Sequence, residues 1–355
     1  MPPLPELVAA RFAESGIAFA VRHTFTGTGP ESVAAAVDAF CREHLGSPVG
    51  GGVFFDASVG TVIGVELADG RRVVVKAHLP GNVPPRFLDA VQTVQRRLAG
   101  DGFPCPEPLL GPRPLELGTA VVETLLDRGA APDAHDPALR RLLARGLADL
   151  VERCRDLTHL DALAEHAMVA SAGALWPTPH DRRFDFAGTS AGAAWIDAIA
   201  TRALALRDGV EAPLVVGHSD WRAQHVRVAD GALTAVYDWD SLRLETEHEC
   251  VGSAAHAFTM NWETREPRLP SPDEARAFVA EYEEARGRPL TEAERRGAFA
   301  ALVYTMSYAA RCEHSDGLTD FGERPPAGAP APIPDDPLTS ARAYIRAFAD
   351  DLLAS

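Results

Sequence analysis

Three short runs of β-branched and aromatic residues near the amino terminus place the strongest constraint on the fold of this 355-residue chain. They cover residues 53–56, 61–67 and 72–76, and turn residues at 57–60 and 68–70 separate them. Short connections of this kind join neighbouring antiparallel strands. The pattern therefore predicts a three-stranded antiparallel meander.

The remainder of the chain is mostly helical in pattern, apart from one further strand expected at 121–126. Apolar residues recur there at helical spacing, and several segments begin with residues that cap helices. The expected helices cover residues 31–45, residues 85–99, a segment capped by Asp136, a segment opened by a capping box of Thr291 and Glu294, and a terminal segment capped by Thr339. Prolines and glycines between Gly317 and Pro337 exclude regular structure. This order of elements indicates the α+β class.

Length and composition favour a globular protein of two sub-domains. The hydrophobic share is 46%, and no apolar run is long enough to cross a bilayer, so we expect no membrane role. The amino terminus lacks the basic start and apolar stretch of a signal peptide, which favours the cytoplasm. The five cysteines are scattered, which argues against a disulfide framework and a zinc site.

The chain is strongly acidic, with a net charge of −16 from 34 Lys and Arg and 50 Asp and Glu residues. Such a charge opposes binding to the backbone of a nucleic acid. It can attract cationic small molecules, or it can serve solubility alone. Both interpretations stay open.

Two apolar runs lead to polar residues that can take part in catalysis or metal binding. The run at 214–216 leads to His218 and Asp220, and the run at 234–237 ends at Asp238. Phosphoryl transfer needs one carboxylate to orient the attacking hydroxyl and another to hold a metal ion beside the phosphates. An aspartate in such a loop can also simply hydrogen-bond its own turn. We interpret His218 as a structural residue that holds the loop by hydrogen bonds to the backbone.

With Lys76 at the end of the third strand, these motifs resemble the aminoglycoside phosphotransferase and choline kinase-like family. The resemblance covers residues 45–315 and is strongest at 216–226 and 235–241. It implies the two-lobe protein kinase-like fold, with a small antiparallel β-sheet N-lobe and a mainly helical C-lobe. The implied boundaries are residues 1–122 for an N-lobe with an N-terminal helical extension, 123–128 for the hinge and 129–355 for the C-lobe with the catalytic loop and acceptor site.

The resemblance also implies a nucleotide in the cleft between the lobes. Lys76 would bind its α- and β-phosphates, and the loop with Ser58 and Gly60 would cover them. The carbonyl of Glu123 and the amide of Leu125 would bind adenine. The structural alternatives are a lysine that serves solubility at the exposed end of an edge strand, and a plain buried strand at 123–126.

In protein kinases the lysine pairs with a glutamate on the next helix. Here the corresponding positions carry Asp89, Val91, Gln92 and Gln95, so the partner of Lys76 is an open question.

The resemblance assigns Asp220 as the catalytic residue and Asp238 as the Mg²⁺ ligand. His225 stands where the family typically has a metal-binding asparagine, and imidazole suits softer ions such as Mn²⁺ better than Mg²⁺. His225 is then an altered metal ligand, a hydrogen-bonding partner of Asp220 or phosphate, or a sign of lost catalysis. Asp240 is a partner of the site or a solvated turn residue.

The implied activity is transfer of the γ-phosphate of ATP, or of GTP, to a hydroxyl of a small molecule. Acidic side chains of the C-lobe could bind an amino-sugar or aminoglycoside-like acceptor: Glu249, Glu313, Asp316 and Asp240. The family's small-molecule members divide between antibiotic resistance and primary metabolism. The alternative is a catalytically impaired, nucleotide-binding pseudokinase. A protein kinase is disfavoured because no Asp-Phe-Gly in the sequence is followed by the Ala-Pro-Glu that completes the protein-kinase pair.

Overall fold

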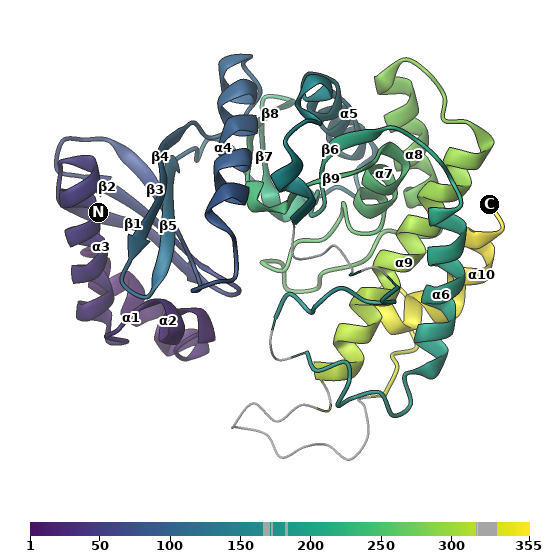
Figure 1. Ribbon diagram of the computed structural model, residues 1–355, viewed down its shortest axis with the longest axis horizontal. Coiled ribbons are helices and arrows are strands. Elements are labelled where there is room, and N and C mark those ends of the chain that lie inside the picture. The colour runs from purple at the N-terminus through teal and green to yellow at the C-terminus, as the bar shows by residue number, and fades with distance from the viewer. Residues whose placement is uncertain (166–170, 172, 182–183, 317, 319–331) are drawn as a thin grey trace. The chain divides into compact units, whose positions relative to one another are not determined.

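The computed structural model describes residues 1–165, 171, 173–181, 184–316, 318 and 332–355 (Figure 1). Most of the proline- and glycine-rich segment, at which we expect no regular structure, lies outside these residues. The chain divides into two compact units, Met1–Asp127 and Arg128–Ser355. Each unit is described separately below.

The first unit is built on a five-stranded antiparallel sheet with the strand order β1-β2-β3-β5-β4. The strands are β1 (Val49–Ala57), β2 (Thr61–Leu67), β3 (Arg72–His78), β4 (Pro108–Leu115) and β5 (Gly118–Thr124). The predicted meander is confirmed as β1 to β3. Strand β4 was not predicted, because Pro108, Pro112 and Pro114 interrupt its pattern. Proline is tolerated only on edge strands, and β4 is the edge of this sheet.

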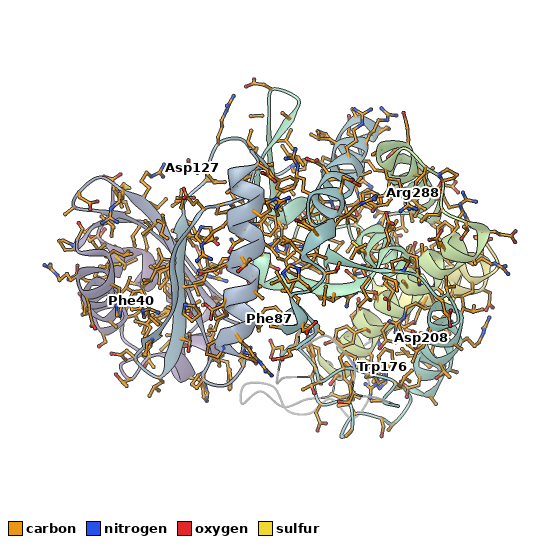
Figure 2. All side chains as sticks on the ribbon, turned by 45° about the horizontal axis from the view of Figure 1, so that its top comes forward. Phe40, Phe87, Asp127, Trp176, Asp208 and Arg288 are labelled. Atoms are coloured by element: carbon orange, nitrogen blue, oxygen red, sulfur yellow. The ribbon has the colours of Figure 1, made fainter. Side chains whose placement is uncertain are left out.

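Helices cover both faces of this sheet (Figure 1). The helices α1 (Leu4–Ser15), α2 (Phe19–Thr24) and α3 (Pro30–Leu45) pack on one face, and α4 (Pro85–Gly100) lies on the other. Figure 2 shows Phe40 of α3 and Phe87 of α4 on opposite sides of the strands. The face under α1 to α3 is a continuous apolar core that includes Val73, Val75 and Val122.

The second unit is mainly helical. Its helices are α5 (Pro137–Arg153), α6 (Ala194–Asp208), α7 (Glu247–Ala255), α8 (Pro272–Arg286), α9 (Glu292–Asp316) and α10 (Ala341–Leu353). Helix α9 runs through the middle of this unit and packs against α6, α7 and α10. Its side chains are buried on nearly all sides, which explains why it carries so few charges after its first two turns.

Two small antiparallel sheets carry the motifs of the second unit. Strand β6 (Leu214–His218) pairs with β9 (Leu242–Thr246), and β7 (Val226–Ala229) pairs with β8 (Ala232–Val236). Two short 3-10 helices, η3 (Ala223–His225) and η4 (Trp239–Ser241), follow β6 and β8. Asp220 therefore lies in the loop after β6 of one small sheet, and Asp238 follows β8 of the other.

The helix caps agree with the sequence in two of three cases. The Asp136 side chain accepts hydrogen bonds from the amides of Ala138 and Leu139 at the start of α5. Thr291 and Glu294 form the expected capping box. At α10, however, the N-cap is Ser340, so the predicted Thr339 cap is wrong. The Thr339 hydroxyl donates instead to the carbonyl of Asp336.

Within the described ranges, no helix combines the length and the apolar character that crossing a bilayer requires.

Candidate active site

His218 fixes the loop that carries Asp220. It ends β6, is fully buried and lies between the rings of Trp221 and Trp239. Its Nε2 lies 2.9 Å from the carbonyl oxygen of Tyr237, and its Nδ1 accepts a hydrogen bond of 3.3 Å from the Asp220 amide. Burial lowers the pKa of His218, so the ring is neutral and holds the backbone, as we expected.

Asp220 is an ionised carboxylate at the end of this loop. Burial alone would raise its pKa, but the Arg222 guanidinium beside it outweighs that effect and holds the pKa below its ordinary value. The Nη2 atom of Arg222 lies 3.1 Å from Asp220 Oδ2. Asp220 is therefore ionised near neutral pH and can accept a hydrogen bond from a hydroxyl group.

Asp238 follows β8 in the left-handed region of the backbone, with φ 61° and ψ 44°. Aspartate tolerates this conformation better than most residues, because its short side chain can bond locally. Here the Ser241 hydroxyl donates to Asp238 Oδ2. The indole of Trp239 is also fixed, because its Nε1 donates to the carbonyl of Val236 at 2.8 Å. The Asp238 carboxylate thus has a defined direction.

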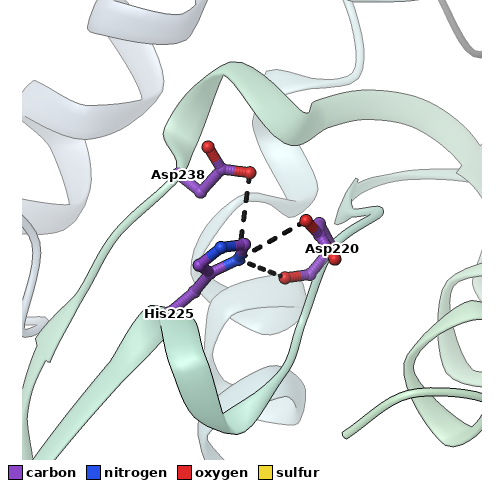
Figure 3. A group of neighbouring side chains, drawn as sticks. All are labelled: Asp220, His225 and Asp238. Atoms are coloured by element: carbon purple, nitrogen blue, oxygen red, sulfur yellow. Dashed lines mark hydrogen bonds and ion pairs between the residues drawn. The ribbon is translucent and has the colours of Figure 1, made fainter. Parts of the chain in front are cut away.

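His225 lies between the two carboxylates (Figure 3). Its Nδ1 is 3.0 Å from the carbonyl oxygen of Asp220, 3.5 Å from Asp220 Oδ2 and 3.9 Å from Asp238 Oδ2. Its Nε2 is 3.3 Å from Arg222 Nη2. A guanidinium can only donate hydrogen bonds, so Nε2 of His225 is the acceptor from Arg222. The proton of the neutral ring is then on Nδ1, which donates a hydrogen bond to the carbonyl of Asp220. Both ring nitrogens are therefore already engaged.

The same three side chains, from Asp220, His225 and Asp238, could hold a metal ion. Their ligand atoms all lie within 4.8 Å of one another. The two carboxylates fit a hard divalent cation, since Mg²⁺ prefers oxygen ligands. His225 could join them only by giving up one of its present hydrogen bonds. Among the three interpretations of His225, the geometry favours a hydrogen-bonding partner of the Asp220 loop.

Arg222 is a residue of this site that we did not predict. It lies two positions after Asp220 and contacts both Asp220 and His225. The available signal was an arginine two positions after the aspartate of the motif. The ion pair between the Arg222 guanidinium and the Asp220 carboxylate makes Arg222 a good candidate for orienting Asp220.

In the first unit, Lys76 lies in the central strand β3 and is buried. The interpretation of a solubility lysine at an exposed edge is therefore wrong. The Nζ atom of Lys76 lies 3.5 Å from Glu123 Oε1. The side chain of Glu123, which we expected to contribute only its backbone carbonyl, is thus a carboxylate partner of the lysine.

The other nucleotide residues that we predicted also lie in the first unit. The Ser58 amide donates to the carbonyl of Gly60 at 2.9 Å and closes the turn between β1 and β2. A Cβ atom on Gly60 would lie 3.0 Å from the carbonyl oxygen of Ala77, so the close approach of two strands favours glycine there. The Leu125 amide donates to the carbonyl of Arg72 at 3.1 Å. That amide extends the pairing of β3 with β5, and its expected role in binding adenine stays a prediction.

The model of the phosphotransferase enzyme family matches residues 61–296, more than half of the chain. The chain belongs to the phosphotransferase enzyme family. The predicted resemblance is confirmed. Among the curated proteins compared, none matches this phosphotransferase.

Two solved structures show the same fold as this phosphotransferase. An amicoumacin kinase has 9% identity and a TM-score of 0.54, with 85% of this chain and 88% of that chain covered. A spectinomycin phosphotransferase has 13% identity and a TM-score of 0.50, with 79% and 86% covered. The predicted α+β, protein kinase-like fold, with a small antiparallel sheet and a mainly helical part, is confirmed.

Two of the acidic residues that we expected to bind the acceptor have structural roles in this phosphotransferase. Glu249 closes the capping box of α7 and pairs with Arg207 at 3.0 Å. Glu313 accepts hydrogen bonds from the first residues of α10, at 2.6 Å from the Ser340 hydroxyl and 2.7 Å from the Ala341 amide. Asp316 is exposed at the end of α9, and Asp240 is partly buried in η4.

The role of Glu313 predicts a loss of stability that does not involve activity. Glu313→Gln should lower the free energy of unfolding by about 1–2 kcal/mol, because charged capping bonds at the start of α10 become neutral. Asp316→Asn, an exposed change on the same helix, is the control and should stay within about 0.5 kcal/mol of the wild type. Urea unfolding followed by circular dichroism measures both. Equal stability of the two variants would contradict the capping role.

Proposed function

We propose that this phosphotransferase moves the γ-phosphoryl group of ATP, or of GTP, to a hydroxyl of a small molecule. The observation that carries the proposal is the cluster of Asp220, His225 and Asp238, whose ligand atoms lie within 4.8 Å of one another. It joins a carboxylate with a lowered pKa to a second carboxylate of fixed direction. These are the two groups that phosphoryl transfer to an alcohol requires.

Asp220 accepts a hydrogen bond from the acceptor hydroxyl and orients it towards the γ-phosphorus. A bond forms between the hydroxyl oxygen and the γ-phosphorus, and the bond from that phosphorus to the β,γ-bridging oxygen breaks. The nucleoside diphosphate leaves with the electron pair, and the hydroxyl proton passes to Asp220. Because the transition state is loose, the proton moves late and orientation is the larger contribution.

The remaining groups bind and orient. Lys76 contacts the α- and β-phosphates of the nucleotide, and the turn at Ser58 and Gly60 covers them. Asp238 would hold a divalent cation, Mg²⁺ or Mn²⁺, which would offset the negative charge of the phosphates. Arg222 holds the Asp220 carboxylate in place through its 3.1 Å contact.

We propose a cationic acceptor, such as an amino-sugar or an aminoglycoside-like antibiotic. The net charge of −16 favours cations at long range. The solved structure of the spectinomycin phosphotransferase contains ADP and spectinomycin, and that of the amicoumacin kinase contains AMP-PNP and Ca²⁺. Spectinomycin and amicoumacin are therefore the first compounds to test, together with neutral sugars as a comparison.

An acceptor screen tests this function. The protein is incubated with ATP or GTP, Mg²⁺ and a panel of amino-sugars, and formation of the nucleoside diphosphate is compared with and without each acceptor. We expect acceptor-dependent formation of diphosphate together with a phosphorylated product in the mass spectrum. A thermal shift with nucleotide but no turnover with any acceptor would support the pseudokinase alternative, which the missing metal-binding asparagine favours.

The exchange of His225 for asparagine separates the roles of this residue. We expect His225→Asn to keep or increase the turnover that Mg²⁺ supports, because an amide oxygen is a harder ligand than imidazole. His225→Leu replaces the ring with a side chain that can neither bind a metal nor form a hydrogen bond. It should lower turnover about fivefold, since a lost hydrogen bond costs about 1 kcal/mol. Steady-state kinetics in Mg²⁺ and in Mn²⁺ measure both variants. A complete loss of activity in His225→Asn would show that the imidazole has a role of its own.

A further inference from the structure

Lys76 and Glu123 form a buried ion pair within the sheet of the first unit. The Nζ atom of Lys76 lies 3.5 Å from Glu123 Oε1, and the two residues are 9% and 4% exposed. The register of β3 and β5 places Lys76 opposite Val121 and Glu123 opposite Val74. Because alternate residues of a strand share a face, Lys76 and Glu123 are diagonal neighbours on the same face.

The face that carries this pair is the one under α4. The other face holds the apolar side chains of Val73, Val75 and Val122 under the first three helices. From α4, the Nε2 atom of Gln95 donates to Glu123 Oε2 at 2.8 Å, and Gln95 is buried as well. One oxygen of Glu123 thus contacts the lysine and the other contacts the helix.

Burial of this ion pair costs free energy, because both charged groups lose their contact with water. An ammonium removed from water needs a carboxylate close by, and the carboxylate needs its remaining lone pairs satisfied. Glu123 meets the first need, and Gln95 meets part of the second. The amide of Gln95 also restricts the rotamer of Glu123, because moving the carboxylate would break the 2.8 Å hydrogen bond.

We propose that Glu123 positions Lys76 for the phosphates of the nucleotide, in the role that a helix glutamate has in protein kinases. The inference rests on the proposed function of Lys76. The backbone ladder between β3 and β5 holds this pair together. Its formation therefore does not require a movement of α4, and Gln95 completes it from that helix through its hydrogen bond to Glu123. The Glu123 side chain is a positioning group that acts through Lys76.

A charge exchange between Glu123 and Gln95 tests the proposal. We expect Glu123→Gln to lower kcat/KM for the nucleotide about 10²-fold, because small displacements of a positioning group cost that much. Gln95→Glu adds a second buried carboxylate and should also lower it. The double variant Glu123→Gln with Gln95→Glu restores one carboxylate beside the lysine and should recover at least a tenth of the wild-type value.

Two further readouts distinguish positioning from a general loss of structure. We expect the KM for the nucleotide to rise in Glu123→Gln and the KM for the acceptor to stay unchanged, whereas partial unfolding lowers kcat and leaves both unchanged. If Glu123→Gln does not fold, Glu123→Asp keeps the charge on a shorter side chain and should show the same rise in the nucleotide KM. A wild-type nucleotide KM in whichever of these two variants folds, or a double variant no better than the weaker single one, would overturn the proposal. A wild-type protein without turnover on any acceptor would instead refute the proposed function.

Discussion

Asp220→Asn is expected to lower kcat by about 10²–10⁴-fold, the range that general-base groups contribute. The carboxylate orients the acceptor hydroxyl and takes its proton, and an amide can do neither in the same way. Asparagine has the same shape as aspartate, so the loop that His218 holds should stay folded. Binding of the nucleotide should change little, because the proposed phosphate contacts come from other residues.

Steady-state kinetics and nucleotide titration measure these two effects separately. Asp230→Asn is the matched control, because Asp230 is exposed in the turn between β7 and β8 and has a left-handed φ of 53° that asparagine also tolerates. It should keep wild-type turnover. Unchanged turnover in Asp220→Asn would remove the catalytic assignment of that residue.

Asp238→Asn is expected to lower turnover about 10²–10³-fold at limiting Mg²⁺, because a bound metal ion contributes several kcal/mol to charge stabilisation. Asparagine is the informative replacement here. The backbone of Asp238 has φ 61°, a conformation that asparagine adopts more readily than alanine. A loss of activity can then be attributed to the lost charge rather than to backbone strain.

The dependence on metal concentration gives the decisive readout for Asp238. We expect the variant to need a much higher Mg²⁺ concentration for half-maximal turnover than the wild type, and some activity should return at high concentration. The Asp230→Asn protein again serves as the control. The same Mg²⁺ dependence in Asp238→Asn and wild type would show that this carboxylate does not hold the metal.

Much of the fold follows from local sequence patterns. The β-branched runs and their short turns predicted β1 to β3, and Asp136 and Thr291 predicted two helix starts, because these signals act between near neighbours in the chain. Strand β4 is stabilised by pairing with β5, and its prolines hide that pairing from local pattern analysis.

The candidate site was predictable to the extent that its residues lie within two short motifs. Asp220 follows β6 and Asp238 follows β8, and the structure brings both together with His225. The pairing of Lys76 with Glu123 depends on the register of two strands that are far apart in sequence, which no local pattern encodes. Sequence alone does not show that Glu249 and Glu313, which we expected to bind the acceptor, cap α7 and α10.

Phosphorus-31 NMR of a reaction with ATP, Mg²⁺ and an acceptor identified in the screen follows the transfer of the γ-phosphoryl group itself. With the wild-type protein, the account predicts that the γ-phosphate signal of ATP is replaced by the signal of a phosphate monoester on the acceptor, alongside ADP. With Asp220→Asn this conversion should be slower by about 10²–10⁴-fold. Release of inorganic phosphate alone, or the same rate of monoester formation in both proteins, would contradict the account.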